Sequence, residues 1–213
     1  MSTIAAMTAD LVIQTPNAET RQLVLLLHGV GADASTLVPL GRRVAQSLPH
    51  ACVVSLQAPY PCDMGRGRQW FSVSGVTEAN RPARVAEALP AMSEQIHRWQ
   101  AQTGLNAAQT TLIGFSQGAI LSLEACSHTA ELAQTVVAIG GRFAVLPSTV
   151  PPSVRFHLIH GTADPVIAVS NAEQGAERLS SLGRGVTLDR FEGVGHFVSA
   201  EMADRIVERL AQV

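Results

Sequence analysis

The sequence contains no lysine, so all fifteen of its basic residues are arginines. Without a lysine ammonium, the chain can build neither a Walker-type phosphate loop, nor a Schiff base, nor a serine–lysine hydrolase. An excess of either charge is also missing, because the formal net charge is −2 at pH 7. A chain this close to neutral has no basic field to attract nucleic acid or anionic lipid, and we expect neither as a partner.

Cysteine and long apolar runs are scarce as well. Cys52, Cys62 and Cys126 lie far apart, and no CxxC pair or His-rich spacing indicates a metal site. Unpaired thiols of this kind are typical of a reduced compartment, so we expect a cytoplasmic protein. The longest apolar run, Leu23–Leu27, is too short to span a bilayer. The segment Met1–Asp10 has neither the basic residues nor the sustained apolar run of a secretory signal.

Apolar segments of strand length alternate with segments of helical periodicity along the 213 residues. No repeat, linker or low-complexity stretch interrupts them, and we expect a single domain over residues 1–213. The alternation predicts the α/β class, with a mostly parallel sheet of about seven strands and helices on both faces. The expected strands are 11–14, 22–28, 51–57, 110–115, 134–139, 154–160 and 186–191. The expected helices are 35–47, a long helix that begins after Asn80, 117–127, 169–182 and 199–213.

The longest expected helix follows Asn80 and contains two prolines. Val85, Met92 and Ile96 recur at helical spacing on one face. Asn80 can cap this helix, and Pro82 suits its first turn. Pro90 lies inside the pattern, where it removes a backbone donor, so we expect a kink or a break there.

The pentapeptide Gly114-Phe115-Ser116-Gln117-Gly118 matches the G-x-S-x-G pattern of a nucleophilic serine. By itself the pattern is common, but here a buried strand precedes it and an apolar helix follows it. A turn this tight strains the backbone of the serine and leaves no room for a side chain on either flanking residue, so glycine fits both. We therefore predict that Ser116 is a catalytic nucleophile.

A histidine and an acid must follow such a serine in the order Ser, acid, His. His196 lies in a glycine-rich loop between the last strand and the last helix, and we predict that it is the base. Asp164 follows a buried strand, and we predict that it orients the histidine. Glu192 is the alternative acid, because it also lies near His196 in the sequence, whereas Asp189 falls within an expected strand.

The segment His28-Gly29-Val30-Gly31 ends the first strongly apolar strand. A hydrolase of this type takes one oxyanion donor from such a loop and the other from the residue after the nucleophile. The predicted donors are therefore the backbone N–H groups of Val30 and Gln117. We expect His28 to brace the loop rather than to transfer protons.

Two adjacent aromatic residues, Trp70 and Phe71, lie in a long irregular stretch beside the expected site. We predict that they bind the substrate, with core packing as the alternative for each of them. Arg66 and Arg68 could hold an anionic group of a substrate, but surface arginines exposed to water are the favoured interpretation.

Together these motifs resemble the carboxylesterase/phospholipase family of α/β-hydrolases, and they are most similar to its bacterial predicted esterases. The resemblance covers nearly the whole chain and rests on four segments, Leu27–Gly31, Gly114–Gly118, His160–Val166 and Gly193–His196. It implies the α/β-hydrolase fold, a Ser-Asp-His triad, no cofactor, and small-molecule esters or thioesters as substrates. It also suggests a homodimer. The segment Gly140–Ser153 departs from the corresponding loop of the thioesterases.

Three functions fit these residues. The first is a serine carboxylesterase for short to medium acyl chains. The second is an acyl-protein thioesterase or lysophospholipase with the same triad. The third is a non-catalytic binding protein of the same fold, but such proteins usually lose a member of the triad, and all three are present here.

Overall fold

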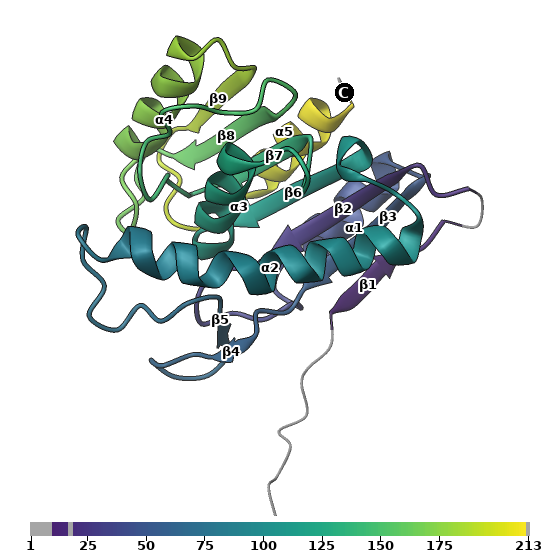
Figure 1. Ribbon diagram of the computed structural model, residues 1–213, viewed down its shortest axis with the longest axis horizontal. Helices are drawn as coiled ribbons and strands as arrows, with labels where there is room; N and C mark the ends of the chain where they lie inside the picture. The colour runs from purple at the N-terminus through teal and green to yellow at the C-terminus, as the bar shows by residue number, and fades with distance from the viewer. Residues whose placement is uncertain (1–9, 17–18, 212–213) are drawn as a thin grey trace, which may run out of the picture.

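Buried strands form the centre of the molecule. The computed structural model describes residues 10–16 and 19–211, and within them seven strands pair in the order β1-β3-β2-β6-β7-β8-β9 (Figure 1). All neighbours pair in parallel except β1, which lies antiparallel to β3 at one edge. The strands are Leu11–Gln14 (β1), Gln22–Leu27 (β2), Ala51–Leu56 (β3), Thr110–Phe115 (β6), Thr135–Ile139 (β7), Arg155–Gly161 (β8) and Val186–Phe191 (β9).

Helices cover both faces of this sheet, as expected from the alternation. One apolar core lies between the sheet and α2, α3 and α4, and a second lies between the sheet and α1 and α5. Figure 1 shows α2 and α3 across the near face and α1 behind the sheet. The helices are Val38–Ser47 (α1), Arg81–Thr103 (α2), Gln117–His128 (α3), Ser170–Ser181 (α4) and Ala200–Leu210 (α5).

The parallel strands are buried from both sides, which explains their continuous apolar sequences. In β2, the side chain of Leu25 is completely buried, and the residue pairs with Val54 on one side and Leu112 on the other. Because the strands run in parallel, the segments that follow β2, β6, β8 and β9 all leave from the end of the sheet at which these strands have their carboxyl termini. The predicted triad residues and oxyanion donors lie in these segments.

The first helix begins three residues later than expected. The sequence predicts a helix from Ser35, but α1 begins at Val38. The carboxylate of Asp33 accepts hydrogen bonds from the backbone N–H and the hydroxyl of Ser35, which holds this part of the chain in turns. A local side-chain bond of this kind competes with helix formation.

Two expectations for α2 are met only in part. The expected break at Pro90 does not occur, because α2 is one continuous helix through this residue. Val85 and Met92, on either side of the proline, are both buried in the core between α2 and the sheet. Asn80 does occupy the N-cap position, but its side chain makes no capping bond. Instead it accepts from the N–H of Thr77 and donates to the carbonyl of Gly75. Pro82 lies in the first turn of the helix, as predicted.

The irregular stretch between β3 and α2 contains a short antiparallel hairpin, in which Tyr60–Pro61 (β4) pairs with Arg68–Gln69 (β5). Its base is fixed by Arg68, whose guanidinium donates to the carbonyls of Ala58 and Pro59. Arg68 is thus a structural brace of this hairpin, while Arg66 is exposed near its tip. A short 3-10 turn, η1 (Ala107–Gln109), precedes β6.

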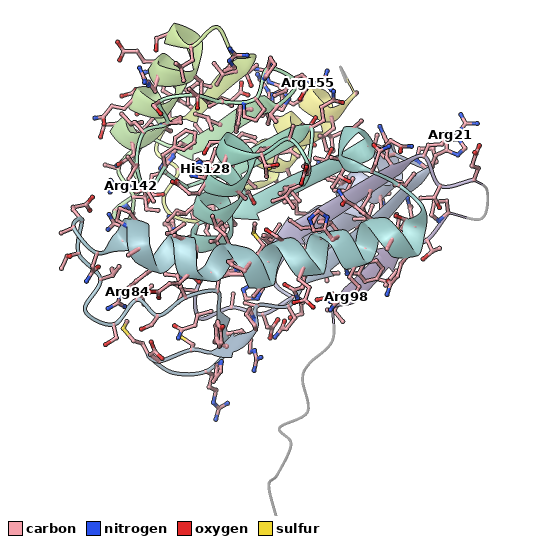
Figure 2. All side chains as sticks on the ribbon, viewed as in Figure 1. Arg21, Arg84, Arg98, His128, Arg142 and Arg155 are labelled. Atoms are coloured by element: carbon pink, nitrogen blue, oxygen red, sulfur yellow. The ribbon has the colours of Figure 1, made fainter. Side chains whose placement is uncertain are left out.

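The segment from residue 140 to 153 is irregular, as expected, and hydrogen bonds attach it to its neighbours. Arg142 donates two hydrogen bonds to the carboxylate of Glu78, ahead of α2, with N–O distances of 3.2 and 2.9 Å. In Figure 2, Arg142 lies by the amino-terminal end of α2. Glu124, in α3, accepts a hydrogen bond from the N–H of Ala144. Among the described residues, no helix is both long and apolar enough to cross a membrane.

The central position of β2 generates a stability prediction. Truncating the completely buried Leu25 to alanine removes apolar contacts and leaves a cavity, so Leu25→Ala should lower the free energy of unfolding by about 2–5 kcal/mol. Leu11→Ala is the matched control in the edge strand β1, where Leu11 is 40% exposed. Urea denaturation of both variants measures the difference. Equal losses would contradict the arrangement of strands described here.

Candidate active site

Ser116 lies in the sharp turn between β6 and α3, where the pattern predicted it. Its backbone has φ 52° and ψ −114°, and it is the one non-glycine residue with positive φ among the described residues. Two hydrogen bonds hold this strained conformation. The N–H of Ser116 donates to the carbonyl of Ile139, in the neighbouring strand β7, and its carbonyl accepts from Ile120 in α3.

The two glycines of the motif are required by close packing. A Cβ added to Gly114 would lie 2.5 Å from the backbone of residues 118 and 119. A Cβ added to Gly118 would lie 2.2 Å from the carbonyl oxygen of Leu27 in β2. Real Cβ atoms do not approach backbone atoms so closely. The turn therefore fits between its own helix and the adjacent strand only without these side chains.

The structure brings Ser116, His196 and Asp164 together in one chain of hydrogen bonds. Nε2 of His196 lies 2.9 Å from Oγ of Ser116, and Nδ1 of His196 lies 2.6 Å from Oδ2 of Asp164. Since a carboxylate only accepts, Nδ1 carries the proton in this contact and Nε2 is free to accept the hydroxyl proton of the serine. This is the arrangement in which a histidine can act as a base for a serine.

Asp164 is held in its charged form by its surroundings. Burial alone would raise its pKa, but the hydrogen bond from His196 and the N–H groups of Ile167 and Val166 outweigh burial and hold the pKa below its usual value. A carboxylate that stays ionised fixes the histidine tautomer and stabilises an imidazolium.

The loop that carries His196 packs tightly on its neighbours. A Cβ added to Gly161, at the end of β8, would lie 2.1 Å from the carbonyl oxygen of Val194. The ring of Phe115 packs against the ring of His196, with centroids 4.9 Å apart. Gly140, at φ 54°, comes close to both Asp164 and His196. These contacts fix the imidazole between the serine and the aspartate.

The alternative acids lie elsewhere. Asp189 is within β9 and pairs with Arg205 and Arg209 of α5. Glu192 is exposed after the same strand. His160 is buried at the end of β8, where its Nε2 lies 2.7 Å from the carbonyl oxygen of Ile167, so it supports the turn that contains Asp164.

The loop after β2 lies directly against the serine. A Cβ added to Gly29 would lie 3.2 Å from Cβ of Ser116. Neither the N–H of Val30 nor the N–H of Gln117 donates a hydrogen bond to another described residue. Gln117 also opens α3, and the amino-terminal end of a helix favours negative charge. Both predicted donors are therefore available for an oxyanion.

His28 braces this loop, as expected. Its Nδ1 donates to the carbonyl of Gly29 at 2.7 Å, and its Nε2 accepts from the N–H of Ala58 at 3.2 Å. The indole N–H of Trp70 donates to the carbonyl of His28. Burial lowers the pKa of the His28 imidazole, although its bond to Gly29 acts in the opposite direction. A neutral imidazole is the form that can both donate and accept here.

Trp70 and Phe71 are both buried, with exposed fractions of 1% and 7%, so little of either side chain is open to a substrate in this structure. They form one wall of a cavity of about 670 Å³ between the β4–β5 hairpin and α2, and their role in substrate binding stays a prediction. The side chain of Gln117 accepts from the N–H of Trp70 and donates to the carbonyl of Phe71, both at 2.7 Å. Sequence reasoning missed this second use of Gln117, because nothing local marks a contact across 46 residues.

Among the described residues, no group of three or more His, Cys, Asp and Glu side chains lies close enough together to hold a metal ion.

Comparison with known proteins identifies the family of this chain. The sequence profile described as "Phospholipase/Carboxylesterase" matches residues 8–213. The chain belongs to this family. It is 45% identical over 187 residues to esterase YpfH of Escherichia coli (strain K12), covering 88% of this chain and 81% of that protein.

Solved structures give the same fold. The crystal structure of esterase PE8 matches with a TM-score of 0.87 at 29% identity, covering 93% of this chain and 96% of that one. The carboxylesterase of Bacillus cereus matches with a TM-score of 0.81 at 18% identity, covering 97% and 95% of the two chains. Acyl-protein thioesterase 2 of Zea mays matches with a TM-score of 0.75, also at 18% identity, covering 95% of this chain and 97% of that one. At such low identity, the last two matches show the fold alone.

The tight turn at Ser116 predicts the effect of a single methyl group. Gly118→Ala must push α3 away from Leu27, so we expect a loss of about 1–3 kcal/mol in the free energy of unfolding and at least about tenfold in esterase activity. Gly185→Ala is the control, since its added Cβ would meet only the flexible side chain of Arg155, at 3.6 Å. Thermal melts and ester hydrolysis compare the two variants. An active, stable Gly118→Ala protein would contradict the close packing of the turn against Leu27.

The buried His28 predicts how stability depends on pH. In the unfolded chain, this imidazole binds a proton near its ordinary pKa of about 6.5, whereas burial keeps the pKa lower in the native state. Near and below a pH of about 6.5 the unfolded state therefore binds more protons than the native state. The free energy of unfolding should fall as the pH falls from about 7 to 5. Burial lowers the pKa of His157 as well, so both histidines contribute.

Urea denaturation at several pH values measures this slope. His28→Gln should reduce the slope, and His50→Gln, at an exposed position, is the control that should leave it unchanged. A slope that is the same in His28→Gln and in the wild type would contradict a neutral, buried His28.

Proposed function

We propose that this chain hydrolyses carboxylic esters through an acyl-enzyme formed on Ser116. Family membership and 45% identity to an esterase make the chain a carboxylic ester hydrolase. The proposal adds the roles of its residues. The observation that carries it is the continuous chain of hydrogen bonds from Ser116 through His196 to Asp164. Beside it lie two backbone N–H groups, of Val30 and Gln117, that donate to no other described residue.

The first half of the reaction forms the acyl-enzyme. Oγ of Ser116 attacks the carbonyl carbon of the ester while Nε2 of His196 takes the hydroxyl proton. The carbonyl oxygen becomes an oxyanion, which accepts hydrogen bonds from the N–H groups of Val30 and Gln117. The tetrahedral intermediate then collapses, and His196 gives the proton to the departing alcohol oxygen. Asp164 stabilises the imidazolium while it exists.

The second half releases the acid. A water molecule takes the place of the alcohol and gives a proton to Nε2 of His196 as it attacks the acyl carbon. The same two amides hold the second oxyanion. Collapse of this intermediate breaks the bond to Oγ and returns the proton to Ser116, so the enzyme is regenerated without a cofactor.

The substrates are small-molecule esters, and we propose short to medium acyl chains. The alternative is a thioesterase or lysophospholipase with the same triad, because a thioester or a lysophospholipid offers the same carbonyl to Ser116. The description of the family names phospholipase beside carboxylesterase. Acyl-chain preference separates the two functions. A cytoplasmic location and a homodimer also stay proposals, the latter tested by sedimentation equilibrium.

Hydrolysis of p-nitrophenyl esters from acetate to palmitate tests this mechanism. Ser116→Ala should lose at least about 10³-fold in kcat/KM, because no other group replaces the nucleophile. Asp164→Asn should lose on the order of 10²–10⁴-fold, because an amide does not fix the histidine tautomer. Ser181→Ala, at an exposed position in α4, is the control and should retain full activity.

Each outcome of this test is informative. A maximum at short chains supports the carboxylesterase assignment, and a maximum at long chains favours the thioesterase or lysophospholipase. Full activity in Ser116→Ala would overturn the assignment of the nucleophile.

A further inference from the structure

The proposed mechanism fixes where the two halves of an ester must lie. The oxyanion faces the amides of Val30 and Gln117. The alcohol oxygen must face Nε2 of His196, because it receives its proton from that atom. The alcohol portion therefore extends along the His196 side of the site, and the acyl portion extends away from it.

A cavity of about 460 Å³ lies between the start of α1 and the start of α5. His196 forms part of its lining, together with Phe115, the residue whose ring packs on the imidazole. Leu37 and Leu40 line it from the α1 side, and Val198 and Ala203 line it from the α5 side. A cavity of this size accommodates a small organic group.

Polar residues are the minority in this cavity. One guanidinium nitrogen of Arg43 forms a salt bridge with Asp204. The hydroxyl of Ser199 accepts a hydrogen bond from the N–H of Met202, as the cap of α5. Most of the lining residues are apolar, so the cavity favours an uncharged, apolar group.

Two larger cavities have a different character. The cavity beside Trp70 and Phe71, of about 670 Å³, includes Asp63, Arg84 and Glu87 in its lining. Another, of about 600 Å³, lies against α2 and includes Asp10 and Arg98. Neither is lined by a member of the triad, whereas the cavity between α1 and α5 is lined by one of them, His196.

We infer that the cavity between α1 and α5 binds the alcohol portion of the substrate, and that the enzyme prefers esters of uncharged, apolar alcohols larger than methanol. This inference rests on the proposed function. It identifies the leaving group as a determinant of specificity, in addition to the acyl chain.

Filling the cavity tests the inference. Ala200 is exposed at the first position of α5 and lines the cavity, so Ala200→Leu should occupy part of it without disturbing the core. Thr36→Leu, from the opposite wall, is an independent second variant. Ala101→Leu, an exposed alanine of α2, is the matched control. Circular dichroism checks that each variant is folded.

The substrates are methyl butyrate, hexyl butyrate and methyl octanoate. The two butyrates form the same acyl-enzyme, so a difference between their kcat/KM values arises in the steps that involve the alcohol. Wild type and Ala101→Leu should prefer hexyl butyrate to methyl butyrate. Ala200→Leu and Thr36→Leu should lower this preference at least about tenfold, while the ratio between methyl octanoate and methyl butyrate stays the same.

Two results would overturn the inference. If both cavity variants keep the preference for hexyl butyrate, or the wild type has none, the cavity does not bind the alcohol. If they change the ratio for methyl octanoate instead, the cavity binds the acyl chain. A folded wild type that hydrolyses none of the three esters contradicts the proposed function itself, and is thereby distinguishable.

Discussion

The strained backbone at Ser116 is the constraint on which the rest of the site depends. A non-glycine residue outside the usual φ/ψ regions costs about 1–3 kcal/mol and persists only where its surroundings enforce it. Here β7 binds the N–H of Ser116, α3 binds its carbonyl, and Gly114 and Gly118 let the turn lie against α3 and β2. The same turn leaves the N–H of Gln117 without an acceptor among the described residues, next to the serine that we propose as the nucleophile.

The parallel sheet supplies the partners of this turn. Asp164 and His196 lie 32 residues apart in the chain and meet because β8 and β9 are adjacent and end at the same edge. Packing then sets the fine geometry. Phe115 supports the imidazole, the N–H groups after Asp164 keep its carboxylate charged, and the loop after β2 closes against the serine.

The sequence was most informative where signals are local. The buried strands were predicted to within about one residue, because unbroken apolar runs and the glycines after them are visible in the chain. Ser116, Asp164 and His196 could be singled out because each follows such a strand. Three features of the helices could not be predicted, because tertiary packing or a competing turn decides them. They are the late start of α1, the continuous helix through Pro90 and the contacts of the Asn80 side chain. The hydrogen bonds from the Gln117 side chain to the backbone of Trp70 and Phe71 have no local signal in the sequence.

The central claim is that the turn and the hydrogen-bonded histidine make Ser116 the nucleophile. Covalent labelling with a fluorophosphonate, followed by peptide mass spectrometry, tests it most directly, because the reagent reacts with an activated serine hydroxyl and needs no knowledge of the substrate. The account predicts one label, on Ser116, formed rapidly in the wild type and much more slowly in His196→Ala. A label on another residue, or equally fast labelling of His196→Ala, would contradict it.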